Sequence, residues 1–201
     1  MTRCVAVLLG PAQWVPPGVA PARWRRAVLE DVVDLLAPLA EVETAVVTTE
    51  ADRPLAEAVI WPGMRVYVVD VATPLSALRH LAQEGYAQAA ILAADAPDLP
   101  SMLVGKLLRP LGRRQAAAAP DIGAERGLLG LAAVLPPPEW LIQADPTLEE
   151  ATVPELRRAA RKPGVVAEAM GWYRLRGPEA FRRLDPALEG WEATRALLSG
   201  V

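Results

Sequence analysis

The sequence predicts an α/β protein of three layers, in which helices cover both faces of a mostly parallel sheet. Short apolar runs, partly β-branched, alternate in the first half of the chain with stretches whose apolar residues follow a helical period. The first run, residues 4–9, is apolar at every position, as expected of a strand buried on both faces. Strands that alternate with helices are joined by crossovers, which make neighbouring strands parallel.

Each expected element has its own signal in the sequence. The helix at 24–39 carries an apolar stripe that includes Trp24, Val28 and Val32, while Arg26, Glu30, Asp31 and Asp34 lie elsewhere on its surface. The expected strands are residues 4–9, 44–48, 65–69, 89–94, 116–119 and 128–135. The expected helices are residues 24–39, 74–84, 154–162 and 186–198, one that begins after Ser101 as its N-cap, and one that begins at a capping box formed by Thr147 and Glu150.

Composition excludes several classes of function. The chain has 201 residues, with 21 basic and 24 acidic side chains and a formal charge of −3, so it lacks the basic excess of a general nucleic-acid binder. The single cysteine, Cys4, and the single histidine, His80, exclude a disulfide framework and a zinc cluster of these residue types. No apolar run is long enough for a membrane span or a secretion signal. We therefore expect one domain over residues 1–201, in the cytoplasm.

Two carboxylates follow the strand predicted at 89–94. Asp95 and Asp98 stand three positions apart, beside Pro97 and Pro100, where the strand meets a turn. Ligands of parallel sheets lie beyond the carboxyl ends of the strands, and Mg²⁺ needs only one or two protein carboxylates besides water and phosphate. Acidic residues at such places also cap turns and helices. From the residues alone, metal binding and capping are equally good interpretations.

Four segments carry a resemblance to known enzymes. Leu-Ala-Ala-Asp-Ala-Pro-Asp-Leu-Pro at 92–100 resembles the metal-binding segment of nucleotidyltransferases of the GT-A type. Thr-Pro-Leu-Ser-Ala-Leu at 73–78 resembles the Gly-Pro-Leu-x-x-Leu segment of molybdenum cofactor guanylyltransferases. Pro120-Asp121 and the helix within residues 19–36 look like segments of 2-phospholactate guanylyltransferases. The resemblance covers residues 3 to 135.

The resemblance implies a nucleotide-diphospho-sugar transferase-like, Rossmann-like fold and a Mg²⁺-dependent transfer of a nucleoside monophosphate. The donor would be a nucleoside triphosphate, with GTP favoured, and the acceptor a small phosphorylated molecule. Carried over, Asp95 is the catalytic carboxylate and holds Mg²⁺ with Asp98 and Asp121, while Gly10, Thr73, Pro74 and Leu75 contact the nucleotide. Residues 1–135 then form a nucleotide-binding core and residues 136–201 a mostly helical extension.

The first loop departs from the family pattern. Families of this type have a Gly-Gly loop with Arg and Lys for the triphosphate, whereas here Gly10 is followed by Pro11, which has no N–H to donate. No lysine precedes Lys106, so Arg23, Arg25 or Arg26 would have to meet the phosphates, although arginines in this helix are equally typical of a solvated face.

Two other interpretations of the sequence stay open. One is a non-catalytic relative that uses its first loop and residues 171–198 to bind a partner or to form a homodimer. The other is a sugar transferase on the same fold. Neither nucleic acid nor a membrane is an expected partner.

Overall fold

The computed structural model describes residues 2–162, 164–184, 187 and 189–200, and its middle layer is a seven-stranded sheet in the order β3-β2-β1-β4-β6-β5-β7. The strands are β1 (Arg3–Leu8), β2 (Glu43–Thr48), β3 (Arg65–Val68), β4 (Gln88–Ala93), β5 (Ala116–Pro120), β6 (Leu128–Val134) and β7 (Val166–Glu168). All pairs are parallel except those of β6, which runs antiparallel to β4 and β5. The predicted mostly parallel α/β sheet is confirmed, as is every predicted strand.

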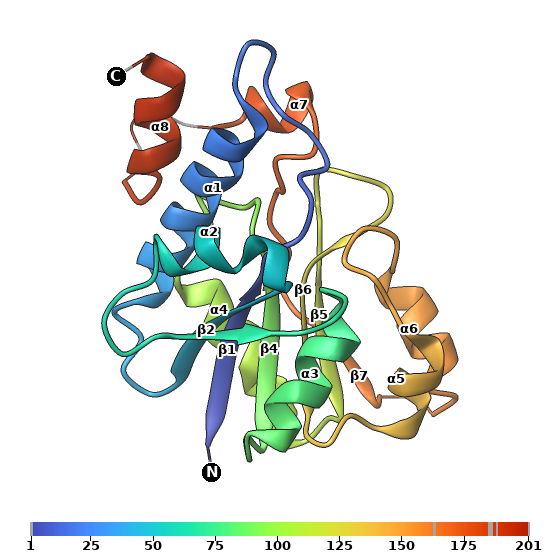
Figure 1. The fold of residues 1–201 in the computed structure, drawn as a ribbon. Coiled ribbons are helices and arrows are strands. Elements are labelled where there is room, and N and C mark those ends of the chain that lie inside the picture. The colour runs from blue at the N-terminus through green and yellow to red at the C-terminus, as the bar shows by residue number, and fades with distance from the viewer. Residues whose placement is uncertain (1, 163, 185–186, 188, 201) are drawn as a thin grey trace.

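Helices cover the two faces of this sheet. They are α1 (Pro21–Leu36), α2 (Arg53–Glu57), α3 (Pro74–Gln83), α4 (Met102–Leu108), α5 (Glu139–Ala144), α6 (Val153–Ala159), α7 (Pro178–Phe181) and α8 (Glu192–Ser199), with short 3-10 turns at Glu50–Asp52 and Arg109–Gly112. Along β1, Cys4 and Ala6 point into the core that includes α3, α5 and α6, whereas Val5 and Val7 point into the core that includes α1, α2 and α4. Figure 1 shows the resulting three layers.

The helix α1 begins and ends three residues earlier than predicted. Its stripe is buried as expected, with Trp24 and Val28 in contact with the C-terminal segment. Asp31, which the pattern places away from the stripe, is nevertheless buried, because its carboxylate accepts hydrogen bonds from the backbone N–H groups of Ala193 and Thr194 at the start of α8. An aspartate that looks like a surface residue in the sequence thus anchors a distant helix.

Helix starts were predicted with mixed success. Thr73 caps α3 by accepting a hydrogen bond from the N–H of Ser76. Ser101 precedes α4, but its side chain makes no capping bond. At the capping box expected for Thr147, the side chain does accept the N–H of Glu150 at 3.2 Å, but residues 148–150 form a turn and no helix begins there. The complete box is Thr152 with Glu155, and it starts α6. Both sites have the same Thr-x-x-Glu pattern, so the pattern alone could not separate them.

The C-terminal segment returns to the core. The sequence predicts a mostly helical extension from residue 136, yet this segment also supplies β7, which pairs with β5 at the sheet edge. The helix predicted at 186–198 is α8; residues 185, 186 and 188 lie outside the described residues. Figure 1 shows α8 beside α1, and α7 beside the loop that follows β1.

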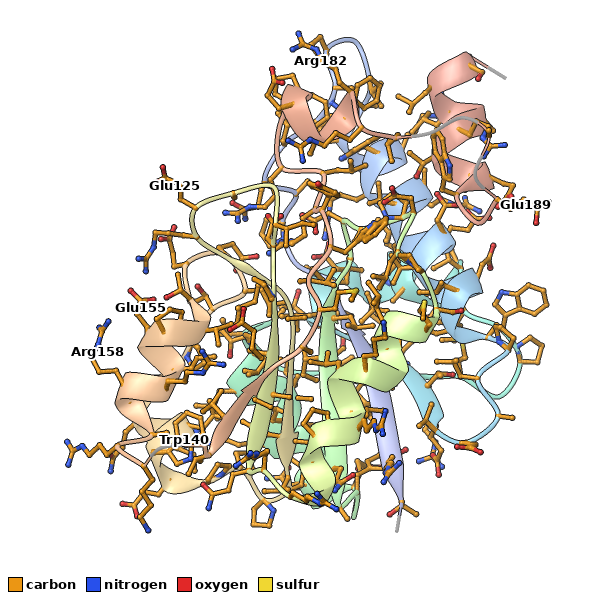
Figure 2. The ribbon with its side chains drawn as sticks, turned by 180° about the vertical axis from the view of Figure 1, so that it is seen from behind. Glu125, Trp140, Glu155, Arg158, Arg182 and Glu189 are labelled. Carbon is orange, nitrogen blue, oxygen red and sulfur yellow. The ribbon has the colours of Figure 1, made fainter. Side chains whose placement is uncertain are left out.

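Many charged side chains lie on the surface of this fold. Arg158 and Arg182 are exposed, and Figure 2 shows both projecting from the surface. Among the helices of the described residues, none has the length and apolar character needed to cross a membrane.

Candidate functional site

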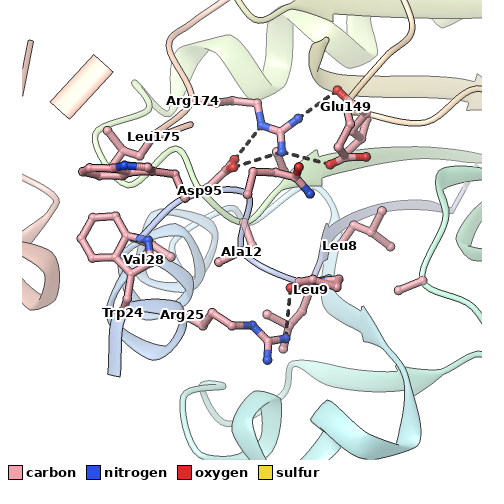
Figure 3. Close-up of a pocket in the computed structure, with 18 residues that line it drawn as sticks. Leu8, Leu9, Ala12, Trp24, Arg25, Val28, Asp95, Glu149, Arg174 and Leu175 are labelled. Carbon is pink, nitrogen blue, oxygen red and sulfur yellow. Dashed lines mark hydrogen bonds and ion pairs between the residues drawn. The ribbon is translucent and has the colours of Figure 1, made fainter. Parts of the chain in front are cut away.

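A cavity of about 140 Å³ lies at the carboxyl edge of the sheet, where β1 and β4 end (Figure 3). Its floor is made by the last residues of these strands, and its walls come from the loop after β1, the first turns of α1 and residues of the C-terminal half. It is lined by Leu8, Leu9, Gly10, Pro11, Ala12, Gln13, Trp14, Trp24, Arg25, Val28, Ala72, Ala93, Ala94, Asp95, Leu148, Glu149, Arg174 and Leu175. This is the edge at which parallel α/β sheets bind ligands.

The loop after β1 carries backbone donors that no protein acceptor uses. Gly10, Ala12, Gln13 and Trp14 all line it, and within the described part of the chain their N–H groups donate to no protein acceptor. A hydrogen bond from the first helix holds the start of this loop: Nη2 of Arg25 donates to the carbonyl oxygen of Gly10 at 3.0 Å. The missing N–H of the proline thus removes one donor from a loop that keeps four others.

Arg25 is itself held by a carboxylate. Its Nη1 and Nη2 atoms donate to Oδ1 and Oδ2 of Asp52 at 2.8 and 2.6 Å, a bidentate pair whose side chains are about one-fifth exposed. Asp52 lies at the start of α2, so this pair ties the first turns of α1 to the next element of the chain. Arg25 therefore holds the loop in place, and its charge is already paired with Asp52.

The opposite wall contains a second paired arginine. Nε and Nη2 of Arg174 donate to the two oxygens of Asp95 at 2.6 and 3.0 Å, and Nη2 also donates to Glu149 at 3.2 Å (Figure 3). Arg174 is only 4% exposed. Burial disfavours its charged form, but the charges of Asp95 and Glu149 outweigh this and raise the pKa of the guanidinium above its usual value.

Backbone contacts hold Arg174 in place. β7 runs parallel to β5, so the chain after β7 arrives at the same edge as Asp95. There the N–H of Leu175 donates to the carbonyl oxygen of Asp95 at 2.7 Å, and the N–H of Ile122 donates to that of Trp172 at 3.2 Å. Gly171 permits this approach, because a Cβ at that position would lie 2.2 Å from the carbonyl oxygen of Pro120.

The other two proposed metal ligands are engaged by protein donors. Asp98 accepts a hydrogen bond from the indole of Trp172 at 3.1 Å, and burial raises the pKa of Asp98 above its usual value. Asp121 is buried, and its Oδ1 accepts the N–H groups of Gly123 and Arg174 while its Oδ2 faces Arg176 at 3.5 Å.

No metal site is prebuilt from these carboxylates. Within the described residues, no group of three or more His, Cys, Asp or Glu side chains is arranged to hold a metal ion. Both oxygens of Asp95 are already bonded to a guanidinium. The Mg²⁺ set expected at Asp95, Asp98 and Asp121 is therefore not assembled, and the residues as arranged do not fit that ion.

The remaining predicted site residues lie around the cavity, outside its lining. Thr73 is occupied as the cap of α3, and Pro74 and Leu75 are buried; of this segment, Ala72 lines the cavity. Arg23 is exposed and does not line the cavity, whereas Arg25, two residues later, does.

Sequence reasoning named Arg25 only as one of three alternatives, and it missed Arg174 and Glu149. Arg174 is 79 residues from its partner Asp95 and belongs to no recognised motif, so the chain offered no local signal for it.

Two rings of the cavity lining belong to an aromatic cluster. Trp14 packs edge-on against Trp24, with ring centroids 5.9 Å apart, and it also contacts Phe181 at 5.8 Å. Trp24 is buried, while Trp14 is half-buried in the loop. Both tryptophans belong to the lining of the cavity.

Comparison with known proteins gives a fold and no family. No protein-family model matches the chain, and no curated protein matches its sequence. Among solved structures it is similar to a candidate nucleotide-diphospho-sugar transferase from Desulfovibrio desulfuricans G20, with a TM-score of 0.63 and 19% identity, covering 100% of this chain and 98% of that one. It is also similar to 4-diphosphocytidyl-2C-methyl-D-erythritol synthase from Anaerococcus prevotii, with a TM-score of 0.62 and 12% identity, covering 98% of each chain.

A third similar structure is a complex of Rv0371C with manganese from Mycobacterium tuberculosis, with a TM-score of 0.57 and 14% identity, covering 93% of this chain and 99% of that one. At such identities the likeness shows the fold alone. The chain has the α/β fold of the nucleotide-diphospho-sugar transferases and cytidylyltransferases, as the sequence resemblance implied; the narrower guanylyltransferase groups find no support among these structures.

Proposed function

We propose that the cavity binds a nucleoside triphosphate and that the protein is a nucleotidyltransferase-like enzyme, which transfers a nucleoside monophosphate to a small phosphorylated acceptor. The observation that carries this proposal is the loop after β1. Four of its residues line the cavity, and their backbone N–H groups have no acceptor in the described part of the chain. Such donors recognise phosphate and base oxygens without a charged side chain.

The proposed reaction asks little covalent chemistry of the protein. An oxygen of the acceptor's phosphate forms a bond to the α-phosphorus of the donor, and the bond from that phosphorus to the bridging oxygen breaks, so that pyrophosphate leaves with the electron pair. Catalysis of this kind rests on positioning and on electrostatic stabilisation. Asp95 at the end of β4 also lines the cavity, and its pairing with Arg174 offsets the negative charge that would otherwise repel the phosphates.

The aromatic side of the cavity suits the base. Stacking on an aromatic ring contributes about 1–3 kcal/mol per base and tolerates any base. Trp14 is the half-buried ring of the lining and is therefore the proposed stacking surface. The resemblance in the sequence favours GTP, whereas the name of the Anaerococcus enzyme favours a cytidine nucleotide. A nucleotide panel separates these two donors.

The Mg²⁺ expected from the resemblance stays a proposal for the nucleotide-loaded protein. Rv0371C with manganese supports a divalent ion on this fold. In this chain the carboxylates of Asp95, Asp98 and Asp121 accept hydrogen bonds from protein donors, so we derive no step through a metal ion. The binding assay below therefore tests each nucleotide both with Mg²⁺ and with a chelator.

A second candidate function is that of a non-catalytic binding protein. It is favoured by the pairing of both arginines in the lining: Arg25 with Asp52, and Arg174 with Asp95. Neither is a free cation for a triphosphate. However, the C-terminal segment that the sequence offered for a partner packs on its own chain, since Trp191 is buried and Trp172 bonds to Asp98.

Thermal denaturation tests the proposed function. ATP, GTP, CTP and UTP are added singly, and a ligand at about 100 times its dissociation constant should add about 2.7 kcal/mol, or several degrees. Trp14→Ala should weaken binding of that nucleotide about tenfold, while Trp61→Ala is the matched control, because Trp61 is exposed and does not line the cavity.

Each class of function predicts a different outcome of this assay. A shift with one nucleotide supports the proposed enzyme, and a shift only with sugar nucleotides supports a sugar transferase. No shift with any nucleotide at millimolar concentration contradicts the proposal and favours the binding protein.

A further inference from the structure

Every N–H of the Arg174 guanidinium has a protein acceptor. The group has five N–H donors. Nε donates to Asp95; Nη2 donates to Asp95 and Glu149; and Nη1 donates to the carbonyl oxygens of Leu128 at 3.1 Å and Leu148 at 2.9 Å. A buried charge with all its donors satisfied is a fixed part of the structure, because each bond must break before the group can move.

These acceptors come from distant parts of the chain. Asp95 follows β4, Leu128 opens β6, Leu148 and Glu149 lie in the turn before α6, and Arg174 itself lies beyond β7. The guanidinium is therefore the point at which the carboxyl edge of β4 is joined to the C-terminal half. Figure 3 shows Arg174 between Asp95 and Glu149, at the wall of the cavity.

This arrangement conflicts with a metal ion on Asp95. A divalent ion bonded to that carboxylate would share it with the guanidinium, and two positive groups on one carboxylate repel each other in a partly buried site. The neighbouring acids are engaged by other donors: Asp98 is half-buried and accepts a hydrogen bond from the indole of Trp172, and Asp121 accepts two backbone N–H groups. With its two acidic partners, Arg174 leaves the cluster a single net negative charge.

We propose that Arg174 is the permanent cation of this site, in the place that the sequence resemblance assigns to a divalent metal ion, and that it keeps such an ion off Asp95. Arg174 is then a positioning residue, which fixes the carboxylate without contacting the acceptor. For the proposed function, on which this last consequence alone rests, a nucleotide binds without a metal ion that bridges its phosphates to Asp95. The loop N–H groups then carry the recognition of its phosphates.

Titration with Mn²⁺ alone tests this proposal, because the spin-resonance signal of free Mn²⁺ reports binding directly. The wild-type protein should bind no Mn²⁺ at Asp95. Arg174→Gln should bind Mn²⁺ at least about tenfold more tightly, since it frees the carboxylate and removes the repelling charge. Arg174→Gln combined with Asp95→Asn should lose this gain.

A matched control separates charge from shape. Arg174→Lys keeps the positive charge but not the planar fork, so it should still exclude Mn²⁺. If Arg174→Gln does not fold, the wild-type protein and Asp95→Asn still decide. Tight Mn²⁺ binding by the wild type that Asp95→Asn abolishes would overturn the proposal, as would a folded Arg174→Gln variant without any gain. Because no nucleotide is present, neither result depends on the proposed function.

Discussion

Replacing Arg174 by glutamine should destabilise the whole domain. The substitution removes the guanidinium that donates to two carboxylates and two carbonyl oxygens, in a site where the arginine is 4% exposed and Asp95 has 15% of its side chain exposed. Breaking a buried ion pair by removing one partner costs about 3–5 kcal/mol. Domains of this kind are stable by only about 5–15 kcal/mol, so the variant should fold but with a clear loss of stability.

Urea unfolding followed by circular dichroism measures this loss. With a slope of about 2 kcal/mol per molar, the midpoint should fall by roughly 1.5–2.5 M. Arg126→Gln is the control, because Arg126 also contacts two acidic side chains but is half exposed, and exposed pairs contribute little. A midpoint of Arg174→Gln within about 0.5 M of the control would refute the account of a fixed, fully bonded guanidinium.

Three further predictions follow from other contacts. Burial raises the pKa of Asp31 from 3.8 to about 6, so the folded protein resists ionisation of this carboxyl between these pH values. As the pH rises from about 4 to about 6, the stability of the wild type relative to Asp31→Asn should therefore fall, by at most about 3 kcal/mol. Parallel pH profiles of the two proteins would contradict this. The Cys4 thiol should resist a thiol reagent until guanidinium chloride unfolds the chain, because burial raises its pKa to about 12; rapid labelling of the native protein would show the account to be mistaken. Arg25→Ala should lower stability by about 1–3 kcal/mol and loosen the first loop, while Arg53→Ala, in an exposed pair, should stay near wild type in the same unfolding assay; equal losses would argue against the anchoring role.

The layers of the fold could be predicted from the sequence because the apolar patterns that mark strands and helices lie within short segments of the chain. Residues 4–9 and 89–94 are short apolar runs, and they became the central strands β1 and β4. The apolar stripe that starts at Trp24 required a buried helix face, and the structure has one there. The three residues of β7 were missed because so short a strand carries no period of its own.

The site could be predicted only in part, since its chemistry depends on contacts between distant segments. The position of Asp95 at a strand end placed it at the ligand edge, where the structure has it. Its partner Arg174 follows the edge strand β7, and it reaches Asp95 only because β7 runs parallel to β5. Asp31 was misassigned for a similar reason, because its partners in α8 lie more than 160 positions away.

Amide chemical-shift mapping on isotope-labelled protein tests the central claim most directly. The nucleotide that stabilises the protein most is titrated while the backbone N–H signals are recorded. The account predicts that the amides of Gly10, Ala12, Gln13 and Trp14 move most, since they are the proposed donors to the ligand. Nucleotide binding that leaves these four amides unmoved would contradict it.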